Sequence, residues 1–148
     1  MKLRLSLLAF SILLGVCLPP ANAEDAKLEA NKKAVLDFFR VVFEAENADA
    51  ANQYLAPDYL QHNPLVATGR DGFINYFKPK WKQPKPVKAK LEDPPVEVIA
   101  EGDLVTLMWK TKKPDPQDKS KTYDAYWFDM FRVKDGKLVE HWDCATKK

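Results

Sequence analysis

Two aspartates and a histidine near the C-terminus are the side chains whose types best suit acid–base chemistry. Asp129 interrupts an aromatic run, residues 126–131, and His141 and Asp143 follow in the next apolar segment. A carboxylate among aromatic residues is costly to bury unless it is paired or lines a cavity. Desolvation favours the protonated form of a carboxyl group, which suits a general acid or base. The three residues are therefore candidates for proton transfer.

The turn between residues 133 and 138 decides which of these side chains face one another. A two-residue turn at Asp135-Gly136 would pair Val133 with Leu138 and place Asp129 opposite Trp142. In that register the polar side chains are not opposite each other.

A three-residue loop, residues 134–136, gives a different register. With Gly136 in a left-handed bulge, Val133 pairs with Lys137, so that Asp129 faces His141. We favour this loop because glycine followed by lysine fits the bulged turn. Four side chains then share one sheet face and two apolar ones lie deeper: Trp127, Asp129, His141 and Asp143, with Phe131 and Val139 below them.

The elements that must position these residues are helices followed by strands. Apolar residues recur at helical spacing over residues 28–46, which predicts a long first helix. Asp49 is a plausible N-cap for a second helix that ends at residue 55. A capping box at residues 68–71 predicts the start of a third helix, over residues 71–77. Residues 58–62 form a short strand or an extended loop. After residue 95 the period becomes extended, with hairpins of 96–100 with 104–112 and 123–133 with 138–144. This order predicts an α+β fold, with helices covering one face of a curved sheet.

The first 23 residues are typical of a secretory signal peptide. Lys2 and Arg4 precede an apolar stretch over residues 5–18, and Ala21-Asn22-Ala23 supplies a cleavage site. We therefore expect a periplasmic or secreted protein of one domain, residues 24–148, with no stable membrane insertion after cleavage. Residues 78–95, with five prolines and six lysines, are predicted to be a surface loop within that domain.

Charge and cysteine content exclude several classes of function. Without Lys2 and Arg4, 21 of the 23 basic residues remain against 21 acidic ones, so the mature chain has no net charge. Nucleic-acid binders need a basic surplus, and we predict no nucleic-acid partner. Cys144 is the only cysteine after residue 23, which excludes an internal disulfide and a cysteine-ligated zinc site.

Three segments carry a family resemblance. Residues 59–64 (YLQHNP), 69–73 (GRDGF) and 128–143 (FDMFRVKDGKLVEHWD) resemble the SnoaL-like proteins of the nuclear transport factor two-like superfamily, which also includes ketosteroid isomerases. The resemblance covers nearly all of residues 24–148. It implies a cone-shaped α+β barrel, in which three N-terminal helices pack on a strongly curved, mainly antiparallel sheet that encloses a pocket.

The resemblance also implies an activity. Polyketide cyclases of this family close rings by intramolecular aldol condensation without a metal or an organic cofactor, so we predict neither. Carried over to this sequence, Asp143 is the acid/base, and Asp129, His62 and His141 tune or orient it. Four aromatic side chains are expected to bind a small-molecule ligand: Trp127, Trp109, Tyr59 and Phe131. A homodimer is expected through the outer sheet face, where Phe128, Met130 and Trp142 would project.

Other interpretations remain open. Many relatives carry histidines on the strand equivalent to residues 104–112, and this chain has none there. A more apolar pocket suits a binding protein that holds an apolar or aromatic ligand without chemistry. A third alternative is an interaction module that uses the lysine-rich loop. Asp129 could be a structural partner of Arg132 or of a backbone amide, and His141 could be a hydrogen-bonded core residue. His62 could belong to a simple turn. Three possible metal ligands share one face, but no HxH or HExxH spacing supports a metal site.

Overall fold

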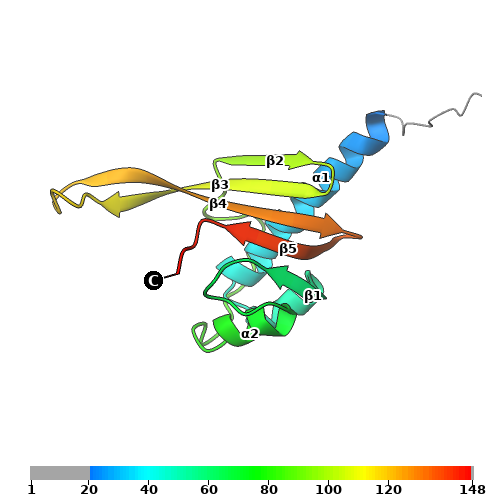
Figure 1. The fold of residues 1–148 in the computed structure, drawn as a ribbon, viewed down its shortest axis with the longest axis horizontal. Coiled ribbons are helices and arrows are strands. Elements are labelled where there is room, and N and C mark those ends of the chain that lie inside the picture. The colour runs from blue at the N-terminus through cyan, green and yellow to red at the C-terminus, as the bar shows by residue number, and fades with distance from the viewer. Residues whose placement is uncertain (1–20, 148) are drawn as a thin grey trace, which may run out of the picture.

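The computed structural model describes residues 21–147, so most of the predicted signal peptide lies outside the described residues. The helical elements are α1 (Ala21–Phe38), a π-helical turn (Phe39–Glu44), a 3-10 helix (Ala48–Gln53) and α2 (Arg70–Phe77). The strands are β1 (Leu55–Gln61), β2 (Glu97–Glu101), β3 (Leu104–Pro114), β4 (Thr122–Lys134) and β5 (Lys137–Asp143) (Figure 1). Over residues 21–147, no helix combines the length and apolar character that crossing a membrane requires.

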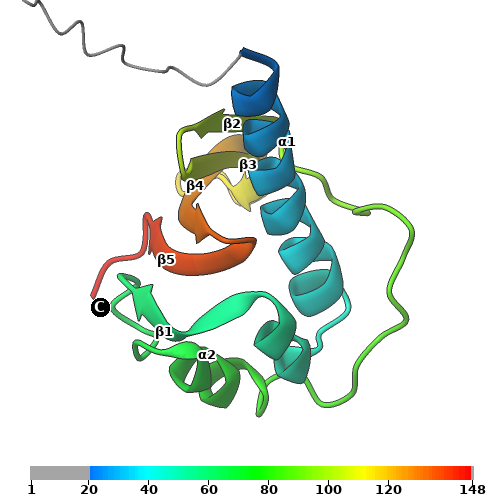
Figure 2. The same cartoon turned by 90° about the vertical axis from the view of Figure 1, so that its right-hand side faces the viewer.

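The five strands form one mixed sheet in the order β1-β5-β4-β3-β2. β1 runs parallel to β5, and the other three pairs are antiparallel. The sheet curves around the helices without closing, because β1 and β2 remain at its two edges (Figure 2). The predicted α+β fold is confirmed. The parallel β1–β5 pair comes in addition to the predicted meander of four antiparallel strands.

The long N-terminal helix changes character where it meets the sheet. Residues 28–46 were expected to form one α-helix, but the α-helix ends at Phe38 and a wider π turn follows. Single π turns inside helices are often found at functional sites. Phe38, which is fully buried, lies 5.8 Å from Phe131 between ring centroids, and Phe39 lies 4.7 Å from Trp109. The turn thus brings consecutive aromatic side chains against the sheet.

Two predicted helix caps differ from the observed ones. The 3-10 helix is capped by Asn47, whose side chain accepts from the Ala50 amide at 3.2 Å, and Asp49 lies in the first turn of that helix. The N-cap of α2 is Gly69, which has a φ of +89°. Thr68 is therefore outside the cap, and its hydroxyl instead accepts from the Gln61 amide of β1 at 3.1 Å.

The β4–β5 turn is also different from the favoured prediction. Asp135 and Gly136 both have positive φ, 51° and 72°, which is the two-residue turn typical of tight hairpins. Val133 therefore pairs with Leu138, and the favoured three-residue loop is wrong.

A bulge just beyond this turn changes the register once more. The next pair is Arg132 with Glu140, so Val139 is the extra residue on β5. Asp129 consequently lies opposite Asp143, and Phe131 opposite His141. The predicted face is retained, except that Leu138 rather than Val139 occupies the core.

Residues 78–95 form a strap that connects α2 with β2 and runs beside the end of the long N-terminal helix (Figure 2). The Lys85 amide donates to the Ala45 carbonyl at 2.7 Å, and Arg40 donates to the Lys88 carbonyl at 2.9 Å. One carboxylate oxygen of Glu44 accepts from the amides of residues 92 and 93, at 2.8 and 3.0 Å. The strap is thus a surface loop, as predicted, and it is fastened to the helix beneath it.

Candidate functional site

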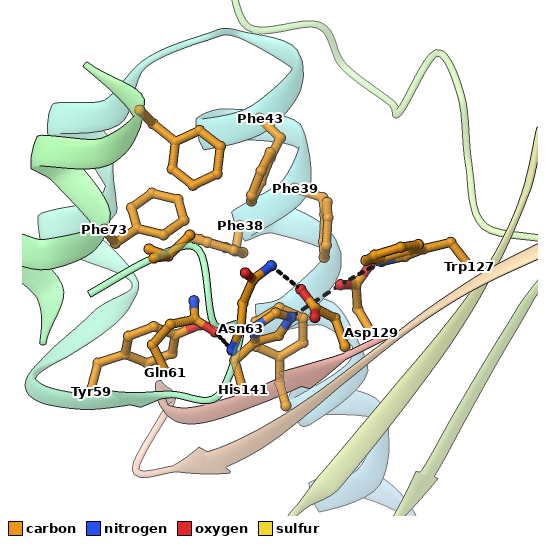
Figure 3. A pocket seen from close by; sticks show the side chains of 14 residues that line it. Phe38, Phe39, Phe43, Tyr59, Gln61, Asn63, Phe73, Trp127, Asp129 and His141 are labelled. Atoms are coloured by element: carbon orange, nitrogen blue, oxygen red, sulfur yellow. Dashed lines mark hydrogen bonds and ion pairs between the residues drawn. The ribbon is translucent and has the colours of Figure 1, made fainter. Parts of the chain in front are cut away.

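A cavity of about 200 Å³ lies between the sheet and the helices (Figure 3). Phenylalanine rings from α1, the π turn and α2 form one wall, and residues of β1, β4 and β5 form the other. The polar side chains that line it are Tyr59, Gln61, Asn63, Asp129, His141 and Asp143. An apolar pocket with a few convergent polar groups is the usual form of a small-molecule site.

Asp129 is held at the polar end of the cavity by three hydrogen bonds. It is only 8% exposed. The indole N–H of Trp109 donates to Oδ2 at 2.7 Å, and that of Trp127 donates to Oδ1 at 3.2 Å. His141 Nε2 lies 3.0 Å from Oδ1. These bonds compensate for the loss of hydration of a buried carboxylate. Asp129 has no contact with Arg132, which pairs with Asp103 and Glu140.

The hydrogen bonds around His141 assign its tautomer. Gln61 Oε1 accepts from the Asn63 amide at 2.9 Å, which fixes the orientation of the Gln61 side-chain amide. His141 Nδ1 lies 2.8 Å from the same oxygen and must donate to it. The opposite nitrogen, Nε2, therefore shares a single proton with Asp129. Neutral imidazole with a protonated Asp129, or imidazolium with its carboxylate, both satisfy this bond.

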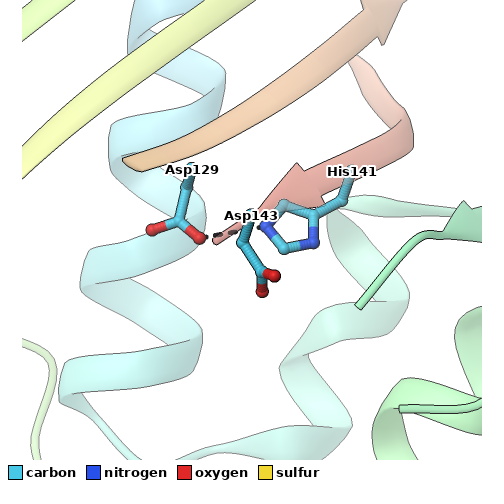
Figure 4. Close-up of side chains that lie close together, drawn as sticks. All are labelled: Asp129, His141 and Asp143. Atoms are coloured by element: carbon cyan, nitrogen blue, oxygen red, sulfur yellow. Dashed lines mark hydrogen bonds and ion pairs between the residues drawn. The ribbon is translucent and has the colours of Figure 1, made fainter. Parts of the chain in front are cut away.

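Asp143 is bound differently from Asp129. Its carboxylate accepts from the Asn63 side-chain amide at 2.6 Å and from the Ala145 backbone amide at 2.9 Å. It is half-buried and lines the cavity. Ligand atoms of Asp129, His141 and Asp143 all lie within 4.8 Å of one another (Figure 4). Three of the four predicted catalytic residues are thus brought together, and their roles stay predictions.

His62 is the exception. Its imidazole lies outside the cavity, stacked on Trp142 with 5.1 Å between ring centroids, and its Nε2 lies 2.9 Å from Glu140. The hydrogen bonds of Glu140 with His62 and then Arg132 lower the pKa of Glu140. The expectation that His62 would be a pocket partner is wrong, because side chains alternate along an extended chain. Its neighbours on either side, Gln61 and Asn63, occupy the cavity instead.

Comparison with known proteins identifies the family and the fold of this chain. Residues 35–141 match the SnoaL-like domain family. The chain belongs to the SnoaL-like family. No curated protein matches it.

Solved structures share the fold at low identity. An NTF2-like protein of unknown function from Mesorhizobium loti superposes with a TM-score of 0.54 at 17% identity, covering 82% of this chain and 94% of its own. A candidate polyketide cyclase from Acidithiobacillus ferrooxidans gives 0.53 at 19% identity, covering 77% and 86%. IdmH, a candidate polyketide cyclase from Streptomyces antibioticus, gives 0.51 at 17% identity, covering 76% and 89%. At such identities the likeness shows the fold alone.

A metal ion would have to compete with the hydrogen bonds of this SnoaL-like site. Carboxylate oxygens and an imidazole nitrogen within 4.8 Å of one another could hold one divalent ion. In the structure, however, His141 Nε2 and Asp129 are directly bonded to each other, and Asp143 is bonded to Asn63. A metal ion would have to separate His141 from Asp129, whose hydrogen-bonding groups are already satisfied by the proton that they share.

The four predicted ligand-binding residues are divided between two hollows of the SnoaL-like domain. Tyr59, Phe131 and Trp127 line the cavity. Trp109 lines a neighbouring groove of about 400 Å³, which we call the outer groove. Burial, and then the charges of Asp129 and Asp143, raise the pKa of the Tyr59 phenol well above its usual range. Tyr59 therefore keeps its proton and can act as a donor but not as a base.

The raised pKa of Tyr59 predicts a loss of stability in alkali. Above about pH 10 the phenol ionises in the unfolded chain but not in the folded one, so the unfolded state binds fewer protons. The free energy of unfolding should then fall with pH, with a slope of up to about 1.4 kcal/mol per pH unit from this residue. In urea unfolding between pH 9 and 12, Tyr59→Phe should show a shallower decline than wild type. The matched change at Tyr123, which is 47% exposed, should keep the wild-type slope. Equal slopes in all three proteins would contradict the assignment.

Proposed function

We propose that this SnoaL-like protein is a cofactor-independent acid/base enzyme that acts on a small carbonyl compound, by aldol-type condensation or isomerisation. The observation that carries the proposal is the pairing of two unlike carboxyl groups at the end of an aromatic cavity. Asp129 is fully engaged by its three hydrogen bonds, whereas Asp143 is half-buried and retains acceptor capacity toward the cavity. Two carboxyl groups in different environments are a common basis for acid/base chemistry.

In this proposal Asp143 removes a proton from the carbon next to the substrate carbonyl. The C–H bond breaks, its electron pair forms an enolate, and Asp143 becomes protonated. In an isomerisation, Asp143 returns the proton to another carbon. In a condensation, the enolate carbon forms a bond with a second carbonyl and the resulting alkoxide takes the proton. The Tyr59 hydroxyl, which stays protonated, is available to donate to the enolate oxygen.

The size of the cavity limits the part of the substrate that can enter it. A cavity of about 150 Å³ lined by apolar side chains can hold benzene, and this one is about 200 Å³. Phe38 and Phe73 in its wall favour a flat, apolar group beside the reacting carbonyl. The proposed substrate is therefore a small enolisable ketone or aldehyde.

Asp143→Asn tests this assignment. The variant keeps the shape and the acceptor oxygen of the side chain but cannot take up a proton, so turnover should fall by about 10²- to 10⁴-fold. Turnover is measured on a panel of small enolisable ketones by exchange of the α-hydrogen for deuterium in NMR spectra. Asp58→Asn removes the same charge from an exposed position on β1 and should keep wild-type turnover. Unchanged turnover in the Asp143 variant would exclude Asp143 as the base.

The second candidate is a binding protein that holds an aromatic ligand in the same cavity. It is favoured by the number of phenylalanines in the wall: Phe38, Phe39, Phe43, Phe73, Phe77 and Phe131. The same panel separates the two functions. A ligand that binds wild type and the Asp143 variant equally, and is recovered with no α-hydrogen exchanged, would support binding without chemistry.

We also propose that two copies of the chain pair through the outer sheet face. Phe128 is 44% exposed there and Ile99 is 61% exposed, next to the half-buried Met130 and Trp142. Phe128→Lys should convert a dimer to a monomer in size-exclusion chromatography with light scattering. Tyr123→Lys, at a similarly exposed position on β4, should remain dimeric. A wild-type protein that is monomeric at all concentrations would refute the proposal.

Export is proposed from the signal-like sequence of residues 1–23. Cleavage after Ala23 would leave the core intact, since the first buried residues of α1 are Asn31 and Val35. The intact mass of protein from the periplasm or medium should correspond to a chain beginning at Glu24. Ala23→Arg should block this processing. Recovery of uncleaved wild-type chain from the cytoplasm would contradict export.

A further inference from the structure

The outer groove lies beside the cavity and shares part of its wall. Phe39, Phe43, Trp127 and Asp129 line both hollows. Trp109 and residues of the strap form the rest of the wall of the groove. Because neither His141 nor Asp143 lines it, its ligand can be considered apart from the proposed reaction.

Aromatic rings form much of the groove. Trp127 is 38% exposed, and Trp109 packs on Phe39 with 4.7 Å between ring centroids. The N–H groups of both indoles are already bonded to Asp129. The tryptophans can therefore offer a ligand their ring surfaces, which attract cations through the ring quadrupole.

The charged residues of the groove are mostly acidic. Glu44 and Asp93 line it together with Asp129, and over residues 21–147 neither Glu44 nor Asp93 has a lysine or arginine nitrogen within 4.0 Å. Among the described residues, Lys110 is the one basic residue in the lining. Its ammonium lies 2.7 Å from Asp124, which also pairs with Lys112, so the charge of Lys110 is partly compensated.

Glu44 is the residue that most needs a partner. Its Oε1 accepts the two amides that fasten the strap, whereas its Oε2 is buried and has no hydrogen-bond partner among the described residues. A buried carboxylate oxygen without a partner is costly. An ion with N–H donors placed between Glu44 and the rings would remove that cost.

We propose that the outer groove binds a small organic ammonium ion, a protonated amine with an apolar body. The ammonium would donate to Glu44 and lie against Trp109 or Trp127, with Asp93 adding attraction from the strap. Leu91 and the phenylalanines would contact the apolar part. Aromatic rings combined with carboxylates that have no lysine or arginine nitrogen within 4.0 Å favour a cation over a neutral molecule of the same shape.

Calorimetric titration with a matched pair of probes tests the charge requirement. Benzylamine is protonated at pH 7, and benzyl alcohol is a neutral molecule of nearly the same shape that can also donate a hydrogen bond. Wild-type protein should bind the ammonium at least about tenfold more tightly, as expected for a cation between aromatic rings and a carboxylate. Equal affinity for the two probes, or no binding of the ammonium, would overturn the proposal.

Three charge-neutralising variants locate the site. Glu44→Gln keeps an oxygen for the strap amides but loses the charge, and should weaken ammonium binding about tenfold. Asp93→Asn, whose side chain does not hold the strap, should weaken it a few-fold and serves if the Glu44 variant is unstable. Glu92→Gln lies on the same strap but outside the groove, near Lys88. It should bind benzylamine with wild-type affinity.

An equal loss of ammonium binding in the Glu92 and Glu44 variants would show only a general effect of surface charge, and it would overturn the proposed site.

Asp143→Asn separates this proposal from the proposed reaction. Asp143 lines the cavity and not the groove, so its variant should bind benzylamine with wild-type affinity. Loss of turnover with retained ammonium binding supports both proposals. Retained turnover refutes the catalytic assignment and leaves the groove unaffected, whereas loss of ammonium binding in this variant would place the ligand in the cavity and overturn the groove.

Discussion

The carboxyl group of Asp129 is the buried polar group around which the sheet is organised. Removing an ion from water costs several kcal/mol unless donors replace the lost hydration. The hydrogen-bond partners of Asp129 come from three neighbouring strands, since Trp109 is on β3, Trp127 on β4 and His141 on β5. Trp109 and Trp127 are paired residues in the β3–β4 ladder. Their indoles therefore reach the same carboxylate, that of Asp129, which lies two residues after Trp127 on β4. The site can form only when all three strands are in register.

A chain of hydrogen bonds leads from the backbone to this carboxyl group, and each bond sets the direction of the next. The Asn63 amide fixes Gln61, Gln61 fixes His141, and His141 then shares one proton with Asp129. Asp143 needs no such proton, since both of its partners are amide donors. Two carboxyl groups within one small site thus have different tasks. Asp129 uses its hydrogen bonds to connect three strands of the sheet, whereas Asp143 can still accept a hydrogen bond from a ligand.

The shared face of β4 and β5 could be predicted from the sequence, but their register could not be predicted from the turn alone. Alternation along β4 directs Trp127, Asp129 and Phe131 to one side whichever turn follows. On β5, Leu138 and His141 are both buried although they are three positions apart. A regular strand cannot turn both inward, so an extra residue must lie between them, and the bulge at Val139 supplies it. The same alternation, continued from the end of β1 into the residues that follow it, predicts Gln61 and Asn63, rather than His62, inside the cavity.

The π turn could not be predicted from periodicity, because apolar positions at 38, 39, 42 and 43 fit an α-helix equally well. Its consequences extend to both hollows. Phe39 and Phe43 form the wall between the cavity and the outer groove, and Glu44 fastens the strap that covers the groove. A regular helix would give these three side chains other directions. The outer groove therefore depends on one irregular turn, just as the cavity depends on one bulge. In both places the departure from regular structure brings polar groups toward a hollow lined by aromatic rings.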